Sequence, residues 1–150
     1  VKTAVLYCVT PAAQGGESTV FNARAAVRAL AQEDIDLVAP LFDPRALTRN
    51  GSAELTGVDG PGFAFVNGEL KTRYSVDYAS FWNCDAVPGL EAALSALAEL
   101  SKPGSAFYTQ TQLEAGELLI MANDAIAHGR LGFSNSESVT RRMGRVLFFD

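Results

Sequence analysis

Cysteine and histidine are both scarce in this chain, which has two cysteines, Cys8 and Cys84, and a single histidine, His128. The two cysteines lie far apart and form no Cys-x-x-Cys pair, so the sequence indicates neither a zinc knuckle nor a redox-active dithiol. We therefore expect two free thiols in a reducing compartment, and a cytoplasmic protein.

Acidic residues outnumber basic residues: the sequence has 12 Lys and Arg and 17 Asp and Glu, which gives a formal net charge of −5. A nucleic-acid-binding surface needs a basic face to neutralise phosphates, so this balance argues against such a partner. No apolar run is long enough to cross a bilayer, and we expect no membrane insertion. With 150 residues, of which 48% are hydrophobic, the chain is suited to a single domain with one core over residues 1–150.

Short apolar segments separated by turn residues predict a mainly β fold. A first strand over residues 3–9 ends where a proline cannot continue the ladder. The dipeptide Asn67-Gly68 separates two expected strands, at 63–66 and 69–74. It favours a type I′ hairpin, because both central positions of that turn need a positive φ.

Helices and longer connections accompany these strands. Asn22 can cap a short helix over residues 23–31, and residues 90–100 have the clearest helical pattern, which we expect to cover one side of the sheet. Residues 43–62 are rich in Gly, Asn, Asp and Pro and are interpreted as a long loop or lid. With another strand over 105–113, the pattern indicates a curled β sandwich with flanking helices.

The stretch over residues 116–133 organises the rest of the chain. The apolar run after Gly116 predicts a buried strand, Asn123 and Asp124 predict a turn, and His128 then stands among small residues. A histidine alone is more often a hydrogen-bonded core or turn residue than a metal ligand.

Three arginines downstream change that interpretation. Arg141, Arg142 and Arg145 precede an apolar strand at 146–149. A guanidinium group donates in a planar, bidentate manner and keeps its charge. Arginines turned inward near a neutral histidine would make a pocket suited to a carboxylate bound beside a metal.

These motifs resemble the C-terminal half of the Fe(II)/2-oxoglutarate-dependent dioxygenases of the taurine dioxygenase and clavaminate synthase-like superfamily. The resemblance rests on Gly-Glu-Leu-Leu from Gly116, on Asn123 five residues before His128, on His-Gly-Arg at 128–130 and on Arg-x-x-x-Arg at 141–145. A Gly-Gly loop leading to a threonine after the first strand adds to it. The resemblance implies a double-stranded β-helix, or jelly roll, that is incomplete in this chain.

The resemblance also implies roles for individual residues. His128 would be the distal histidine of an iron site made of two histidines and one carboxylate. Arg141 would pair with the far carboxylate of the cosubstrate 2-oxoglutarate, Thr19 would donate its hydroxyl to it, and Arg145 would lie near the cosubstrate or the substrate. Arg142 stays a rival for Arg141, because the register is uncertain by one residue and neighbours on a strand point to opposite faces.

The implied reaction uses Fe(II), 2-oxoglutarate and O2 to oxidise, typically hydroxylate, a C–H bond of a small molecule, with release of succinate. The remaining iron ligands of this superfamily come from a His-x-Asp or His-x-Glu motif upstream of the first strand, and this chain has no second histidine. We therefore expect a partner that carries this motif, either an N-terminal segment or a second chain. The protein could accordingly form an oligomer.

Two other hypotheses stay open. The chain could be a degenerate relative that binds a small carboxylate without metal, or a structural β-sandwich interaction module in which His128 and the arginines serve packing.

Overall fold

The computed structural model describes residues 1–49 and 57–149. Its first layer is a three-stranded antiparallel sheet with β1 (Thr3–Thr10) at the centre, between β10 (Leu118–Ala122) and β13 (Arg142–Phe148). Three strands that lie far apart in the sequence thus form one sheet.

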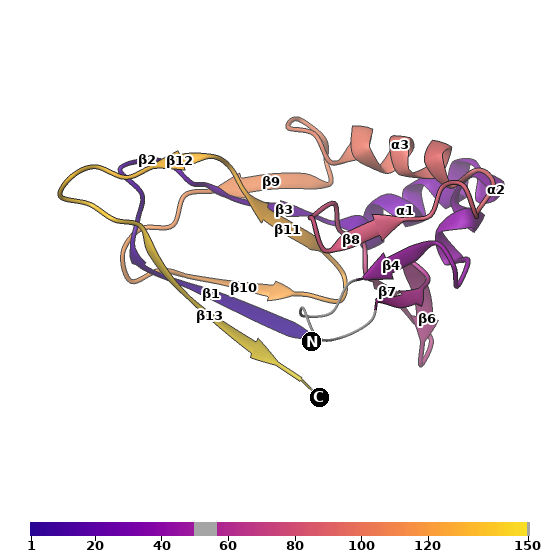
Figure 1. Cartoon of the computed structure of the whole chain (residues 1–150), viewed down its shortest axis with the longest axis horizontal. Coiled ribbons are helices and arrows are strands. Elements are labelled where there is room, and N and C mark those ends of the chain that lie inside the picture. Colours follow the sequence, from indigo (N-terminus) through magenta and orange to yellow (C-terminus); the bar gives the residue numbers. More distant parts are fainter. Residues whose placement is uncertain (50–56, 150) are drawn as a thin grey trace.

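The second layer is another three-stranded antiparallel sheet, in which β3 (Ser18–Phe21) lies between β11 (Ala127–Arg130) and β9 (Tyr108–Thr111). Figure 1 shows the two sheets as two layers that run side by side. The short strands β2 (Gln14–Gly15) and β12 (Phe133–Ser134) pair near the end remote from the helices. The layered, mainly β fold with flanking helices is confirmed.

The helices gather at one end of the molecule (Figure 1): α1 (Ala23–Glu33), α2 (Ile35–Val38), the 3-10 helix η1 (Ala39–Phe42) and α3 (Leu90–Leu100). Asn22 caps α1 as predicted, since its side-chain oxygen accepts a hydrogen bond from the Ala25 amide at 3.1 Å. The main core lies here and includes Phe63, Leu41 and Leu97, which are fully buried. In the described part of the chain, no helix is long and apolar enough to span a membrane.

Helix α3 occupies its predicted residues but not its predicted place. It packs against α1, α2 and η1 rather than across one side of a sheet. The face formed by Leu90, Ala93 and Leu97 is buried there, because the neighbouring helices offer the apolar surface that this face needs.

A third sheet and a hairpin connect the helical end to the two layers. The sheet has the order β5 (Val58–Gly60), β4 (Leu47–Arg49), β8 (Ser80–Trp82), and the hairpin pairs β6 (Phe63–Val66) with β7 (Glu69–Thr72). The hairpin turn is confirmed, since Asn67 and Gly68 have φ values of 52° and 78°.

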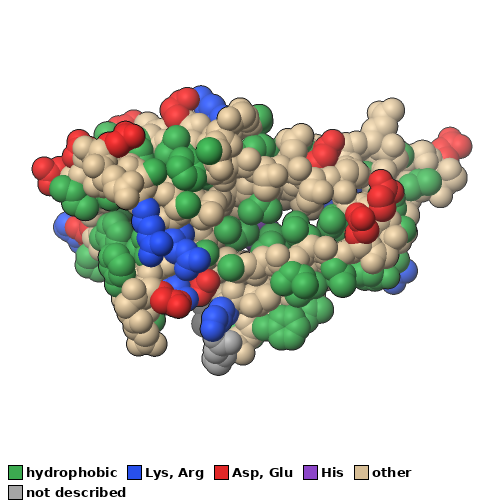
Figure 2. Space-filling model, turned by 180° about the vertical axis from the view of Figure 1, so that it is seen from behind, with side chains coloured by type: hydrophobic (Ala, Val, Ile, Leu, Met, Phe, Trp, Pro, Cys, Tyr) green, Lys and Arg blue, Asp and Glu red, His purple; other side chains and the backbone are tan. Residues whose placement is uncertain are grey.

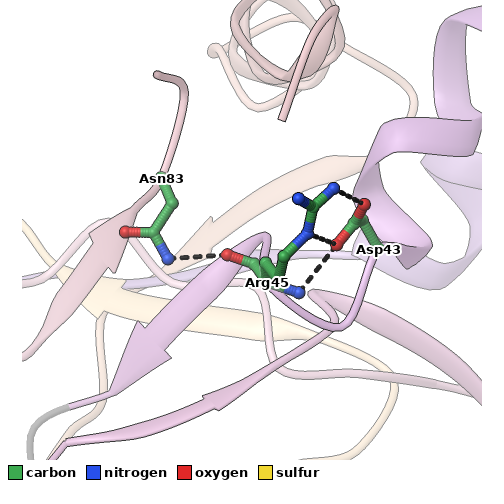
Figure 3. Close-up of polar contacts among 3 residues, drawn as sticks. All are labelled: Asp43, Arg45 and Asn83. Atoms are coloured by element: carbon green, nitrogen blue, oxygen red, sulfur yellow. Dashed lines mark hydrogen bonds and ion pairs between the residues drawn. The ribbon is translucent and has the colours of Figure 1, made fainter. Parts of the chain in front are cut away.

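Strands β4 and β5 correct the prediction of a continuous loop over residues 43–62. The segment begins with a turn that Asp43 stabilises: its carboxylate accepts hydrogen bonds from the backbone and guanidinium of Arg45, at 2.8 to 3.0 Å (Figure 3). Asn83 donates to the Arg45 carbonyl at 2.6 Å and so ties this turn to the residue after β8. Residues 50–56 of the predicted loop lie outside the described residues, and a role as a lid stays a prediction.

The apolar strand predicted after Gly116 exists as β10, but it is not buried. Leu118 and Ile120 are 57% and 67% exposed, whereas Met121 on the opposite face is 4% exposed. On the other side of β1, Val146 and Phe148 of β13 are 54% and 52% exposed, and Val146 lies in one row of the sheet with Ile120, since both pair with Val5. The prediction was wrong because β10 is an edge strand of a sheet whose outer face the described residues leave uncovered. We call this surface, made of Leu118, Ile120, Val146 and Phe148, the outer apolar face.

Candidate functional site

The two layers enclose a cleft of about 930 Å³. Thr19 lines it from β3, His128 from β11 and Arg145 from β13, so each of the two layers contributes to it. Seen from behind, the space-filling view in Figure 2 shows the molecule hollowed between its layers. Thr19 and Arg145 are separated by 126 positions in the sequence and meet only through the sheet topology.

Thr19 and His128 are placed by one pair of strands. In the register of β3 and β11, Thr19 lies opposite Gly129, and Val20 lies opposite His128. The Thr19 hydroxyl oxygen lies 3.1 Å from the position that a Cβ on Gly129 would take. Glycine after the histidine therefore leaves room for the threonine hydroxyl at the cleft.

His128 and Arg145 approach the cleft from opposite layers. His128 is exposed to solvent at the cleft, yet the protein atoms around it desolvate the imidazole enough to lower its pKa below the ordinary value of 6.5, and the positive charge of Arg145 lowers it further. The imidazole is therefore neutral at neutral pH, which is the form that binds metals. Arg145 is exposed at the cleft, opposite Leu6 of β1.

Arg141 and Arg142 differ clearly in their surroundings. Arg142 opens β13 opposite Thr10 and is exposed. Arg141 is partly buried: its guanidinium lies 5.3 Å from the centre of the Phe133 ring, and its backbone amide donates to the Asn135 side chain at 2.9 Å. Burial lowers the pKa of Arg141, and the charge of a neighbouring arginine, Arg130, lowers it further.

The loop that leads to Thr19 lies close to Arg141. A Cβ on Gly16 would come within 3.3 Å of the Arg141 Nε atom, and Gly16 has a positive φ of 83°. The structure thus brings Thr19, His128 and Arg145 together at the cleft and sets Arg141 beside the Gly-Gly loop, on the Phe133 ring.

Other cleft residues escaped the sequence analysis. Arg49, Lys71 and Arg73 also line the cleft. Asp124 lines it too, and its carboxylate forms an ion pair with the Lys71 ammonium group at 2.5 Å. No motif marks these basic residues, since their place depends on how the third sheet and the β6–β7 hairpin pack beside the layers. Asp124 is held by Lys71, so it is not a free carboxylate ligand.

Nearly the whole chain matches a protein-family model. Residues 1–147 match the model described as taurine catabolism dioxygenase TauD, TfdA family. The chain belongs to the TauD/TfdA family.

Two curated TauD/TfdA relatives are named uridine-5′-phosphate dioxygenase. The relative from Amycolatopsis sp is 33% identical over 155 aligned positions, which cover 99% of this chain and 55% of the relative. The relative from Streptomyces sp is also 33% identical, over 98% of this chain and 56% of the relative. The chain therefore spans about half the length of these relatives.

Solved structures of oxygenases share the fold. A structure of asparagine oxygenase in complex with Fe(II), 3-hydroxyasparagine and succinate aligns with a TM-score of 0.67 and 22% identity, over 96% of this chain and 44% of that one. A structure of the non-heme iron oxygenase OrfP with Fe and alpha-ketoglutaric acid aligns with a TM-score of 0.67 and 20% identity, over 96% and 43% of the two chains. The chain thus shares the fold of these two oxygenase structures, over 44% and 43% of their length.

The described residues do not by themselves form an iron site of the TauD/TfdA type. They contain no group of three or more His, Cys, Asp and Glu side chains able to hold a metal ion. His128 offers a neutral imidazole at the cleft, and the nearby carboxylate of Asp124 is engaged by Lys71. The described residues therefore offer a metal at this cleft one imidazole, and not a complete ligand set.

Proposed function

We infer that this chain is the C-terminal part of an Fe(II)/2-oxoglutarate-dependent dioxygenase that hydroxylates a small molecule. The observation that carries the inference is the meeting of Thr19, His128 and Arg145 in one cleft of a chain that belongs to the TauD/TfdA family. Iron, when bound, supplies the oxidation of a C–H bond by O2, coupled to decarboxylation of 2-oxoglutarate to succinate.

The chain's own residues bind and orient the iron and the cosubstrate. His128 provides one neutral nitrogen ligand. Arg145, exposed in the cleft, and Thr19, whose hydroxyl lies over Gly129, hold the carboxylates of 2-oxoglutarate. Arg141, the first arginine of the Arg-x-x-x-Arg motif, joins them; its partial burial favours it over the exposed Arg142.

A further segment completes the iron site. It carries the His-x-Asp or His-x-Glu motif and belongs either to the same polypeptide or to a second chain. Two features support this proposal: the chain spans 55% of its Amycolatopsis relative, and the outer apolar face is uncovered by the described residues.

The substrate we propose is a nucleotide, with uridine-5′-phosphate as the first compound to test. The support is the 33% identity to two relatives that carry this substrate in their names. The cleft has the size of a site for a molecule of this kind.

A chimeric enzyme tests the proposal. The segment of the Amycolatopsis relative that precedes the matched region is joined ahead of Val1, and succinate formation is measured with Fe(II), 2-oxoglutarate and uridine-5′-phosphate. We expect succinate formation that requires both iron and the nucleotide, and its loss in His128→Ala, with Arg142→Gln as an active control.

The alternatives predict different results. A folded chimera without iron-dependent turnover, whose 2-oxoglutarate binding is independent of metal and lost in Arg141→Ala, would identify a metal-free carboxylate binder. A folded chimera that binds neither 2-oxoglutarate nor iron would identify a structural module and refute the proposed function.

A further inference from the structure

The four basic side chains that line the cleft differ in how they are neutralised. Lys71 is held by two carboxylates, Asp124 at 2.5 Å and Glu69 at 2.6 Å. Its charge is therefore balanced within the protein. For Arg73 and Arg145, no carboxylate among the described residues lies within ion-pair distance of 4.0 Å.

The charge of Arg49 is balanced only in part. Its guanidinium is 3.6 Å from the carboxylate of Asp77, and both side chains are substantially exposed. A pair of this kind is weak, because solvent screens it. The Arg49 guanidinium therefore keeps donors for another anion, and it lies near enough to Arg73 for the two positive charges to interact.

The position of Arg73 is set by the backbone around it. Its amide donates to the Gly62 carbonyl at 2.7 Å, and its guanidinium fills the space that a side chain on Gly60 would occupy. One guanidinium nitrogen donates to the Val58 carbonyl at a long 3.4 Å, so among the described residues most of its donors have no acceptor. Arg73 is thus held in place without being neutralised.

The electrostatics agree with this geometry. Partial burial lowers the pKa of Arg73, and the charge of Arg49 lowers it further. Two neighbouring guanidinium groups, of which only Arg49 has a carboxylate within ion-pair distance among the described residues, are stabilised by an anion that accepts from both. A phosphate group, with several acceptor oxygens and about two negative charges, matches such a pair better than a single carboxylate does.

Arg73 is linked through packed aromatic side chains to β11, the strand that carries His128. The next residue, Tyr74, packs edge to face on Phe21, with ring centroids 5.7 Å apart. Phe21 lies opposite Ala127, the residue before His128. One pair of aromatic rings therefore separates the Arg73 backbone from the strand that carries the histidine.

We propose that Arg73, assisted by Arg49, is the subsite for the phosphate group of the substrate. The inference rests on the proposed function and adds the residues that select a phosphorylated substrate. Within the cleft, Arg145 serves the carboxylate of the cosubstrate near His128, while Arg73 and Arg49 anchor the substrate through its phosphate.

Binding measurements on the 150-residue chain test the subsite without any turnover. Isothermal titration compares uridine-5′-phosphate, uridine and inorganic phosphate in wild type, Arg73→Gln, Arg73→Lys and the control Arg28→Gln, which removes an exposed arginine of α1 away from the cleft. We expect wild type and Arg28→Gln to prefer the nucleotide over uridine. Arg73→Gln is expected to weaken nucleotide binding about tenfold to a hundredfold and to abolish that preference, and Arg73→Lys to restore part of it.

Titration of 2-oxoglutarate into the same variants separates this subsite from the proposed function. An unchanged 2-oxoglutarate affinity in Arg73→Gln, together with weaker nucleotide binding, would support a substrate subsite. Equal binding of nucleotide and uridine by wild type, no binding of either, or the same nucleotide affinity in Arg73→Gln and Arg28→Gln would overturn it. If Arg73→Gln does not fold, as judged by circular dichroism, Arg49→Gln gives the same test. We then expect a partial loss of the preference for the nucleotide over uridine. An unchanged preference in Arg49→Gln would overturn the subsite.

Discussion

Arg145 acts on His128 across the cleft, although the two residues belong to different sheets. Together with partial burial, which is the larger effect, the positive charge of Arg145 keeps the pKa of the imidazole below 6.5. The arginine proposed to hold the cosubstrate thus also keeps the proposed iron ligand in its metal-binding form.

Removing that charge should be visible in the titration of the histidine. We expect Arg145→Gln to raise the pKa of His128 toward 6.5 without restoring it fully, because burial remains. Two-dimensional NMR of the imidazole against pH measures the shift. Arg142→Gln is the matched control, since it removes a charge from the exposed side of β13; an equal shift in both variants would contradict a specific effect of Arg145.

The same histidine links stability to pH. Its folded pKa lies below the unfolded value, so the unfolded chain binds more protons as the pH falls below 6.5. We expect the contribution of His128 to stability to be complete above pH 6.5 and to decline as the pH drops through the folded pKa. Urea unfolding of wild type and His128→Gln between pH 7 and about pH 5 isolates it, because the glutamine variant lacks this dependence.

Gly129 gives a test of the packing beside Thr19. A methyl group at Gly129 would lie 3.1 Å from the threonine hydroxyl oxygen, closer than packed atoms normally approach. We expect Gly129→Ala to cost about 1 kcal/mol of unfolding free energy, and Thr19→Ser to relieve none of it, because serine keeps the oxygen. Gly132→Ala, where a Cβ meets no atom within 4 Å, is the control in urea denaturation; an equal loss there would rule out crowding by Thr19.

The turn before β4 offers a prediction about acid. The hydrogen bonds from Arg45 lower the pKa of Asp43 to about 2, from an ordinary value of 3.8. The stability that this carboxylate contributes is present above pH 3.8 and is lost as the pH falls toward 2. In Arg45→Gln we expect the Asp43 pKa, measured by NMR of its carboxyl carbon, to return toward 3.8; an unchanged value would show that the guanidinium is not its cause.

Two adjacent residues of β10 test which face of the first layer is covered. Met121 is buried and Ile120 is exposed. We expect Met121→Ala to cost about 2 to 5 kcal/mol, as for other buried large-to-small changes, and Ile120→Ala to change stability by no more than about 0.5 kcal/mol. Similar losses for both variants in urea unfolding would mean that the outer apolar face is covered in solution.

Local chemistry explains why some elements could be predicted. Asn22 caps α1 through its own side chain, and Asn67 with Gly68 adopts the positive φ values of its turn, so these features depend on residues next to one another. The family motifs likewise placed Thr19, His128 and Arg145, which do share a cleft. Their roles in binding iron and cosubstrate stay predictions.

Other features depend on partners that no local pattern reveals. The apolar composition of β10 indicates burial, but whether a strand is buried depends on what covers the sheet, and Leu118 and Ile120 are exposed. Strand β4 was hidden in a segment rich in turn residues because it is three residues long and is held by β5 and β8. Arg73 was missed because the role proposed for it depends on the lack of a carboxylate beside it among the described residues, which no local sequence pattern reveals.

The outer apolar face also affects how the isolated chain adsorbs to surfaces and associates in solution. Exposed leucine, isoleucine, valine and phenylalanine side chains on one face of a sheet favour adsorption to plastic and to air–water interfaces and the binding of environment-sensitive dyes. Among the described residues, β10 and β13 are the edge strands of this sheet, and edge strands offer backbone groups with which another copy can pair. We therefore expect the isolated chain to stay dispersed best at low concentration or with a mild detergent, and the fluorescence of such a dye to fall when that face becomes covered.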